Sequence, residues 1–202
     1  MPVLMVPPDT GERWPTLGPQ VCDFIKQNLV FGPGDLRGLP AVLDPEKQAL
    51  IWHMYEVYPQ GHRFEGRRRF KRVGLSLAKG LAKTELAAWI AACELHPDAP
   101  VRASGFDAEG NLTQGHGVRS PFIPLVAFTE EQSEELAYGT LFVVLAEGPL
   151  ASDFEIGLER IARRRGDGEA VPLAGSPSGR DGARTTFEVF DETHWWTLPR
   201  LK

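Results

Sequence analysis

Apolar residues at helical spacing account for much of the hydrophobic pattern of this chain. Apolar residues recur every three or four positions in PQVCDFIKQN, which places Val21 and Ile25 on one helix face. Asp44 is a good N-cap, and Pro45 suits the first turn of the next helix. TELAAWIAAC combines strong helix formers without a breaker. We therefore predict helices at residues 19–28, 45–57 and 84–93, a helix capped by Thr129, and a helix at residues 154–164.

Shorter runs with a period of two, or with continuous apolar character, predict strands. FKRVGLSL places Val73, Leu75 and Leu77 on one face, whereas IPLVAF is apolar almost throughout. Residues 96–121 are polar and rich in Gly, Asp and Asn, so they predict a loop or a hairpin. The predicted strands are at residues 70–77, 123–128 and 186–190. Because strands alternate with helices, the expected fold class is α/β, with a mainly parallel sheet flanked by helices.

Composition narrows the class of protein. The chain has 202 residues, of which 42% are hydrophobic and 24% charged, as expected of a soluble domain with a sizeable core. The net charge of −5 means that any contact with DNA comes from a local basic patch. Cys22 and Cys93 form no CxxC pair, which fits a reducing compartment. No apolar run is long enough for a signal peptide or a membrane span, so we expect a cytoplasmic protein.

The segment SLAKGLAKTE follows the first predicted strand and contains the first candidate chemistry. A phosphate-binding loop needs a strand, a loop of small residues, a Lys-Thr pair and a helix whose N-terminal N–H groups face the phosphates. Lys83 and Thr84 match the pair, with the ammonium for the terminal phosphates and the hydroxyl for Mg²⁺. Gly80 supplies backbone freedom. The usual pattern GxxxxGK[ST] has glycine at the positions of Leu77 and Ala82, so the alternative is a strand and helix that bind nothing.

An acidic pair ends the last predicted strand, in TFEVFDETH. A nucleotide hydrolase has an Asp at such a strand end to hold Mg²⁺, and a Glu beside it to polarise the attacking water. Asp191 and Glu192 fit these roles, and the alternative is a solvated acidic turn. Because both motifs follow predicted strands in the expected order, we predict that folding brings Lys83 and the acidic pair around a shared magnesium–triphosphate.

Two basic runs are further candidates. The first precedes the phosphate loop and can contact DNA phosphates, although a solvated strand edge is the slightly favoured interpretation. It consists of Arg67, Arg68, Arg69, Lys71 and Arg72. The second run, residues 163–165, ends the helix predicted at residues 154–164 and suits the negative end of its dipole.

Taken in order, these motifs resemble the large terminase subunit of tailed phages over roughly residues 40–196. In that family a glutamine in an upstream helix contacts adenine, which matches Gln48 in LDPEKQALIWHMY. The basic stretch GRRRFKRVGLSL then leads into the loop, where Lys79 takes the place of the family's Arg or Lys and Ala82 that of its glycine. LVAFTEEQSEE resembles the next strand and helix, and DGARTTFEVFDETHWW resembles the Asp-Glu strand.

The resemblance implies a P-loop NTPase-type fold with ATP and Mg²⁺ as cofactors. It implies that Glu192, Lys83 and Lys79 are catalytic and that Thr84 and Asp191 are metal ligands. The nucleotide-binding residues that it implies are Gln48, Lys79, Gly80, Leu81, Ala82, Lys83, Thr84 and Glu85.

The function implied is ATP hydrolysis that drives phage DNA into the procapsid, in the host cytoplasm. The implied partners are double-stranded DNA, the small terminase subunit, the portal protein and further copies in a ring. We expect a lead-in and helix at residues 1–40 and a partial ATPase domain at residues 41–202, without the family's nuclease domain. The alternatives are a helicase-like ATPase, because residues 191–194 spell a DExH box, and a nucleotide-binding remnant without turnover, because of Ala82.

Overall fold

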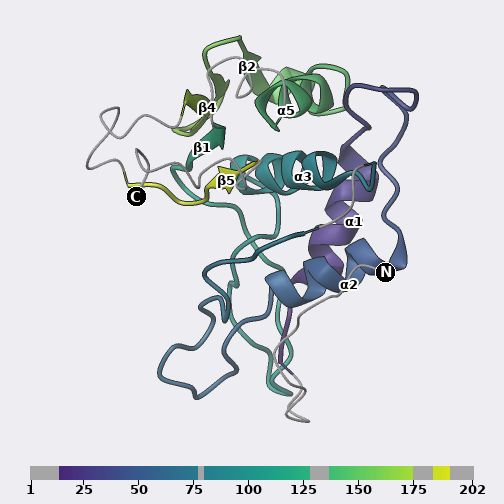
Figure 1. The fold of residues 1–202 in the computed structure, drawn as a ribbon. Helices are drawn as coiled ribbons and strands as arrows, with labels where there is room; N and C mark the ends of the chain where they lie inside the picture. The colour runs from purple at the N-terminus through teal and green to yellow at the C-terminus, as the bar shows by residue number, and fades with distance from the viewer. Residues whose placement is uncertain (1–13, 77–79, 128–136, 175–183, 192–202) are drawn as a thin grey trace, which may run out of the picture.

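The computed structural model describes residues 14–76, 80–127, 137–174 and 184–191. Figure 1 shows helix α3 in the middle of the fold, with a small sheet on one side and helices α1 and α2 on the other. The helices are α1 (Gly18–Asn28), α2 (Pro45–Met54), α3 (Lys83–Leu95), α5 (Ala137–Ala146) and the short 3-10 helix η1 (Ala151–Asp153). The strands are β1 (Phe122–Ala127), β2 (Phe154–Ile156), β3 (Ile161–Arg163), β4 (Glu169–Ala174) and β5 (Val189–Phe190).

Local sequence accounts for the helix positions. Asp44 caps α2, because its carboxylate accepts a hydrogen bond from the Lys47 backbone N–H at 2.8 Å. Helices α1 and α3 form where periodicity and propensity predict them. The described part of α5 begins at Ala137, and the cap predicted at Thr129 lies outside the described residues. None of the described helices combines the length and the apolar character needed to cross a membrane.

The sheet contains five strands in the order β2-β3-β4-β1-β5. Strand β1 pairs in parallel with β4 on one side and β5 on the other, so Leu125 lies between Pro172 and Val189. Strands β2, β3 and β4 pair antiparallel. The α/β class is confirmed, but the sheet is mixed rather than mainly parallel. The carboxyl ends of β1 and β5 lie at the same edge, which is where ligands bind in open α/β sheets.

Two predicted elements are wrong. Residues 154–164 form the β2–β3 hairpin instead of a helix, because Phe154 and Ile161 become buried on the sheet while Gly157 takes part in the turn. Residues 70–76 form no strand with any described neighbour, and Val73 is 43% exposed. Alternating apolar residues make a strand only where a second strand satisfies the backbone N–H and C=O groups.

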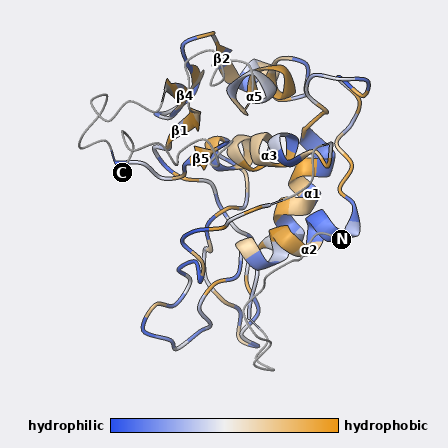
Figure 2. Cartoon of the chain, in the orientation of Figure 1, coloured by the Kyte–Doolittle hydropathy of each residue, from blue (hydrophilic) through white to orange (hydrophobic). Residues whose placement is uncertain are grey.

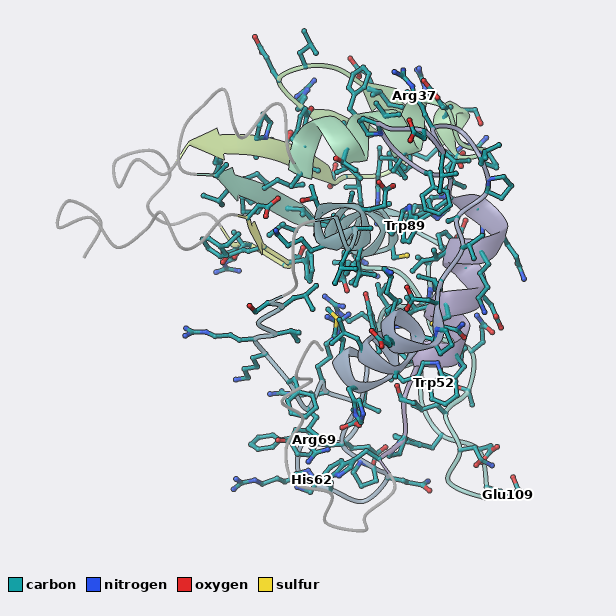
Figure 3. The ribbon with its side chains drawn as sticks, turned by 45° about the vertical axis from the view of Figure 1, so that its right-hand side comes forward. Arg37, Trp52, His62, Arg69, Trp89 and Glu109 are labelled. Carbon is teal, nitrogen blue, oxygen red and sulfur yellow. The ribbon has the colours of Figure 1, made fainter. Side chains whose placement is uncertain are left out.

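The hydrophobic core is built around α3. Most residues of this helix are buried, and Figure 2 shows apolar colouring along α3, β1 and β4. Trp89 is fully buried and lies at the centre of the fold in Figure 3. Its indole N–H donates to the Val30 carbonyl at 2.8 Å, and its ring packs edge-on against Phe31. Helix α5 packs on α3 from the side of the sheet, and α1 contacts α3 as well.

Two irregular arms, residues 57–69 and 101–116, form a lobe below α3 in Figure 1, which we call the lower lobe. Isolated antiparallel bridges close the arms, between Val57 and Arg68, Arg102 and His116, and Phe106 and Leu112. The second arm, a loop closed by two isolated antiparallel bridges, agrees with the loop or hairpin that the composition of residues 96–121 predicts. Figure 3 places His62 and Arg69 in this lobe, at the opposite end of the molecule from Arg37.

Candidate functional site

The loop that enters α3 has a left-handed backbone at two positions. They are Gly80, with φ of +87°, and Ala82, with φ of +54°, and no other described residue with a Cβ has positive φ. For such a residue this conformation costs about 1–2 kcal/mol. Ala82 is also the N-cap of α3 and its side chain makes no capping hydrogen bond. The Ala82 side chain therefore caps none of the first-turn N–H groups of α3, and a helix N-terminus is a place where anions bind.

Thr84, in the first turn of α3, meets the acidic end of β5. Its hydroxyl donates a hydrogen bond to the Asp191 carboxylate, with 3.0 Å between Oγ1 and Oδ2, although the residues are 107 positions apart. Asp191 is 8% exposed, and its backbone N–H donates to the Val126 carbonyl, which continues the pairing of β1 with β5. The fold thus brings a hydroxyl and a carboxylate together at the carboxyl edge of the sheet. Both groups are hard oxygen ligands of the kind that Mg²⁺ prefers.

Lys83 lines the same cleft as Asp191. The cleft has a volume of about 150 Å³ and lies between residues 73–75, α2, α3 and β5. Much of its wall is apolar and includes Leu86 and Ile90. Ligand pockets usually enclose about 300–1,000 Å³, so this cleft is too small for a whole nucleotide. The end of α3, rather than the cleft, is the part of the site that suits a phosphate group.

The Glu85 carboxylate contacts the loop that follows α1. It accepts a hydrogen bond from the Gly32 backbone N–H at 2.6 Å. Burial raises the pKa of this carboxyl, and the Gly32 N–H, which favours the charged form, opposes that shift. The contact holds the N-terminal turn of α3 against the loop at Gly32. A role of Glu85 in nucleotide binding stays a prediction.

Gln48 lies on α2 with its amide already hydrogen-bonded. The amide nitrogen donates to the Leu43 carbonyl at 2.8 Å, and the amide oxygen accepts from the Lys26 ammonium at 3.5 Å. The residues of α2 that line the cleft are Leu50 and Met54. The structure therefore brings Gln48 to α1 rather than into the cleft. Its contact with adenine stays a prediction.

The remaining predicted site residues belong to the loop before α3 and to the segment after β5. Gly80 and Leu81 are exposed at the entrance to α3. Lys79 and Glu192 lie outside the described residues. Of the predicted set, the structure thus brings together Lys83, Thr84 and Asp191.

A buried ionic network, which the motif analysis missed, occupies the other end of α3. Glu94 is fully buried, accepts from the Tyr55 hydroxyl and from Arg102, each at 2.9 Å, and pairs with Arg68. Burial, and next the charge of Glu94, raise the pKa of Tyr55 well above its ordinary value. Arg102 also donates to the Thr186 carbonyl at 3.5 Å, shortly before β5. A carboxylate within the apolar run AAWIAACEL is the sequence signal for this network, because buried carboxylates need partners.

The fold divides the first basic run into inward and outward members. Arg68 pairs with Glu94, and Arg69 pairs with Glu56 at 2.5 Å. Neither side chain is therefore part of a solvated edge. The exposed members are Arg67, Lys71 and Arg72.

The second basic run does not end a helix. Arg163 belongs to β3 and is buried, and it donates hydrogen bonds to the carbonyls of Leu95 and Arg119. The interpretation through a helix dipole is wrong because residues 154–164 pair as strands. Arg164 and Arg165 are exposed in the turn that leads to β4.

Known proteins with similar sequence or fold come from phages. No family model matches the chain. The Gene 13 protein of Mycobacterium phage L5 is 28% identical over 154 residues, which cover 76% of this chain and 24% of that protein. The large terminase of bacteriophage HK97 matches in structure with a TM-score of 0.62 and 19% identity, over 88% of this chain and 31% of that chain. The chain thus has a large-terminase-like fold, as its motifs predict, and spans about a quarter to a third of these proteins.

Proposed function

We propose that this chain is the nucleotide-binding part of a phage large terminase, in which ATP binding and hydrolysis drive DNA packaging. The hydrogen bond between Thr84 and Asp191 carries the proposal. These are the two residues that the sequence predicts as ligands of one Mg²⁺, and they lie in contact at the carboxyl edge of a sheet. The similarity in fold to the HK97 large terminase supports the packaging role.

The residues present fit ATP and Mg²⁺. The N-terminus of α3 presents backbone N–H groups that the Ala82 side chain does not cap, and Lys83 supplies a cation at the same place. In the proposed site Lys83 holds the terminal phosphates, and Thr84 and Asp191 hold the metal ion. When bound, Mg²⁺ neutralises the phosphate charge and favours transfer of the terminal phosphoryl group to water.

Three further roles in the site follow from the resemblance. Glu192, next to Asp191, is the proposed general base that takes a proton from the attacking water. Lys79 is the proposed second cation of the loop, and Gln48 the proposed contact to adenine. For packaging, the proposed partners are double-stranded DNA, the small terminase subunit, the portal protein and further copies of the same chain in a ring, in the host cytoplasm.

A second candidate function is nucleotide binding without turnover. The left-handed conformation of Ala82 favours it, because a methyl group stands where the phosphate-loop pattern has glycine. A steady-state assay of phosphate release separates the two functions. Release above the level of a Lys83→Ala variant supports the ATPase, whereas Mg-ATP binding without release supports the second candidate.

A calorimetric titration of the whole chain with Mg-ATP tests the site itself. We expect the wild type to bind and the Lys83→Ala variant to bind at least about tenfold more weakly, since it loses a charged contact to phosphate. Lys47→Ala is the matched control, because Lys47 pairs with Asp44 on α2, outside the proposed site. This control should bind as the wild type does. Equal affinity of the wild type and Lys83→Ala would refute the proposed site.

A further inference from the structure

The arm at residues 57–69, with the residues that follow it, carries a concentration of exposed positive charge. Four cationic side chains are exposed there, and we call them the basic face: Arg63, Arg67, Lys71 and Arg72. None of the four forms an ion pair with another described residue. Glu65 is the only carboxylate in the sequence between residues 61 and 72. In a chain of net charge −5, this is a local reversal of sign.

We propose that the basic face binds the backbone phosphates of duplex DNA. Guanidinium and ammonium groups are the side chains that bind phosphate most strongly, and Arg matches its oxygens with two parallel N–H groups. The choice of DNA as the source of these phosphates rests on the proposed packaging function. The phosphate chemistry itself rests on the charge and exposure of the four cations and does not depend on the site at Thr84.

The inward members of the same run anchor the face. Arg68 pairs with buried Glu94, and Arg69 pairs with Glu56. The Arg68 guanidinium also lies over the Tyr55 ring at 4.1 Å. Neighbouring residues therefore point in opposite directions: the side chains of Arg68 and Arg69 pair with buried carboxylates, and that of Arg67 lies in solvent. A segment fixed in this way presents its outward cations with less loss of conformational freedom on binding.

An aromatic cluster supports the cations and argues for duplex over single-stranded DNA. Tyr58 stacks on His62, with ring centroids 4.4 Å apart, and both rings contact Phe64. The Arg63 guanidinium lies over the Phe64 ring at 4.5 Å, and Arg67 lies 5.9 Å from it. These rings contact one another and the guanidinium groups, so their first role is to orient the cations for a backbone; Phe64 is 36% exposed, and the Phe64→Leu variant tests stacking on an unpaired base.

Fluorescence anisotropy with a short labelled DNA duplex, in a series of salt concentrations, tests the proposal on the whole chain. Four phosphate contacts predict a slope of log K against log salt of about −3.6. The double variant Arg63→Ala/Arg67→Ala should make the slope shallower by about 1.8 and weaken binding at low salt. The matched control is Arg164→Ala/Arg165→Ala, which removes the same charge from an exposed turn next to β3. This control should bind as the wild type does.

Further variants separate charge from fold and from the nucleotide site. Arg63→Lys/Arg67→Lys should retain most of the slope, since the charges remain. Should the double alanine variant lose cooperative thermal unfolding, Lys71→Gln/Arg72→Gln on the segment after the arm replaces it, with the same expected loss of slope. Lys83→Ala should bind DNA as the wild type does, and Arg63→Ala/Arg67→Ala should titrate normally with Mg-ATP. The two proposals therefore fail independently.

Four results would overturn the inference, the last of them only its assignment to DNA. The first is DNA affinity unchanged in both basic-face variants. The second is an equal loss in the Arg164→Ala/Arg165→Ala control, which would indicate a nonspecific effect of net charge. The third is preference for single-stranded DNA that Phe64→Leu abolishes, which would indicate base stacking. Equal binding of duplex RNA would retain the phosphate contacts and overturn the assignment to DNA.

Discussion

Among single residues, Ala82 shows how a departure from a sequence pattern appears as backbone strain. The phosphate-loop pattern has glycine at this position, and the structure gives Ala82 a φ of +54°. Glycine adopts this conformation without steric cost, whereas the alanine Cβ approaches a neighbouring carbonyl oxygen. The loop therefore keeps the backbone that glycine would give while it carries a methyl group. Backbone strain is typical of functional loops, and here it lies next to Lys83 and Thr84.

Ala82→Gly should therefore stabilise the chain. Relief of left-handed strain contributes about 1–2 kcal/mol, and the greater freedom of glycine in the unfolded chain offsets part of it, for a net gain of about 0.5–1 kcal/mol. Urea unfolding measures the difference. The control Ala87→Gly, inside α3, should lower the free energy of unfolding by about 1 kcal/mol, because helix interiors disfavour glycine. Opposite signs for the two variants are expected, and a destabilised Ala82→Gly chain would contradict the strain argument.

At the scale of elements, the sequence predicts the helices that local signals determine, and it predicts poorly the strands that depend on partners distant in sequence. The cap at Asp44 and the propensity of TELAAWIAAC place α2 and α3, because these features act within a few residues. Residues 154–164 have helical composition, but pairing within the sheet overrides it. Residues 70–76 have a strand pattern, yet no described strand lies beside them to complete the hydrogen bonds. Both errors come from partners that a local pattern does not specify.

The contacts at the two ends of α3 also differ in how far the sequence predicts them. Contact between Thr84 and Asp191 was predictable from motif order and from the position of Asp191 at the end of a predicted strand, although residues 70–76 before the loop form no strand with any described neighbour. The partners of Glu94 were not, since Tyr55 and Arg68 lie 39 and 26 positions away along the chain and no motif links either residue to Glu94. A carboxylate in an apolar helix indicates that partners exist but does not identify them.

Loss of the Glu94 charge should destabilise the fold. Glu94→Gln leaves Arg68 and Arg102 without the carboxylate that they share in the interior, and breaking a buried ion pair on one side costs about 3 kcal/mol or more. Thermal or urea unfolding measures this loss. Glu159→Gln, at an exposed position between β2 and β3, is the control and should change the free energy of unfolding by about 0.5 kcal/mol or less. Similar small effects in both variants would show that the network is not a stabilising feature.

In the molecule as a whole, α3 connects the proposed nucleotide site with the buried network around Glu94. Its first turn carries Lys83 and Thr84, its last turn carries Glu94, and its middle lies in the core. The segment that contains β5 reaches both ends of α3: Asp191 accepts from Thr84, and the Thr186 carbonyl accepts from Arg102, which in turn pairs with Glu94. A ligand at the first turn of α3 therefore binds a structure that exists only when the core, the sheet and the network are folded. Binding energy at that turn should appear as stability of the whole chain.

This linkage gives a measurable expectation for Mg-ATP. At a concentration about 100 times Kd, the ligand should add about 2.7 kcal/mol, which corresponds to a rise of about 5–10 °C in Tm for a chain of this size. AMP lacks the phosphates that Lys83 is proposed to hold, and chelation of Mg²⁺ removes the ion proposed for Thr84 and Asp191, so either change should reduce the rise. Thermal scans of the wild type and Lys83→Ala measure these differences. An equal rise with AMP would show that binding does not depend on the end of α3, because the adenosine part alone would then account for it.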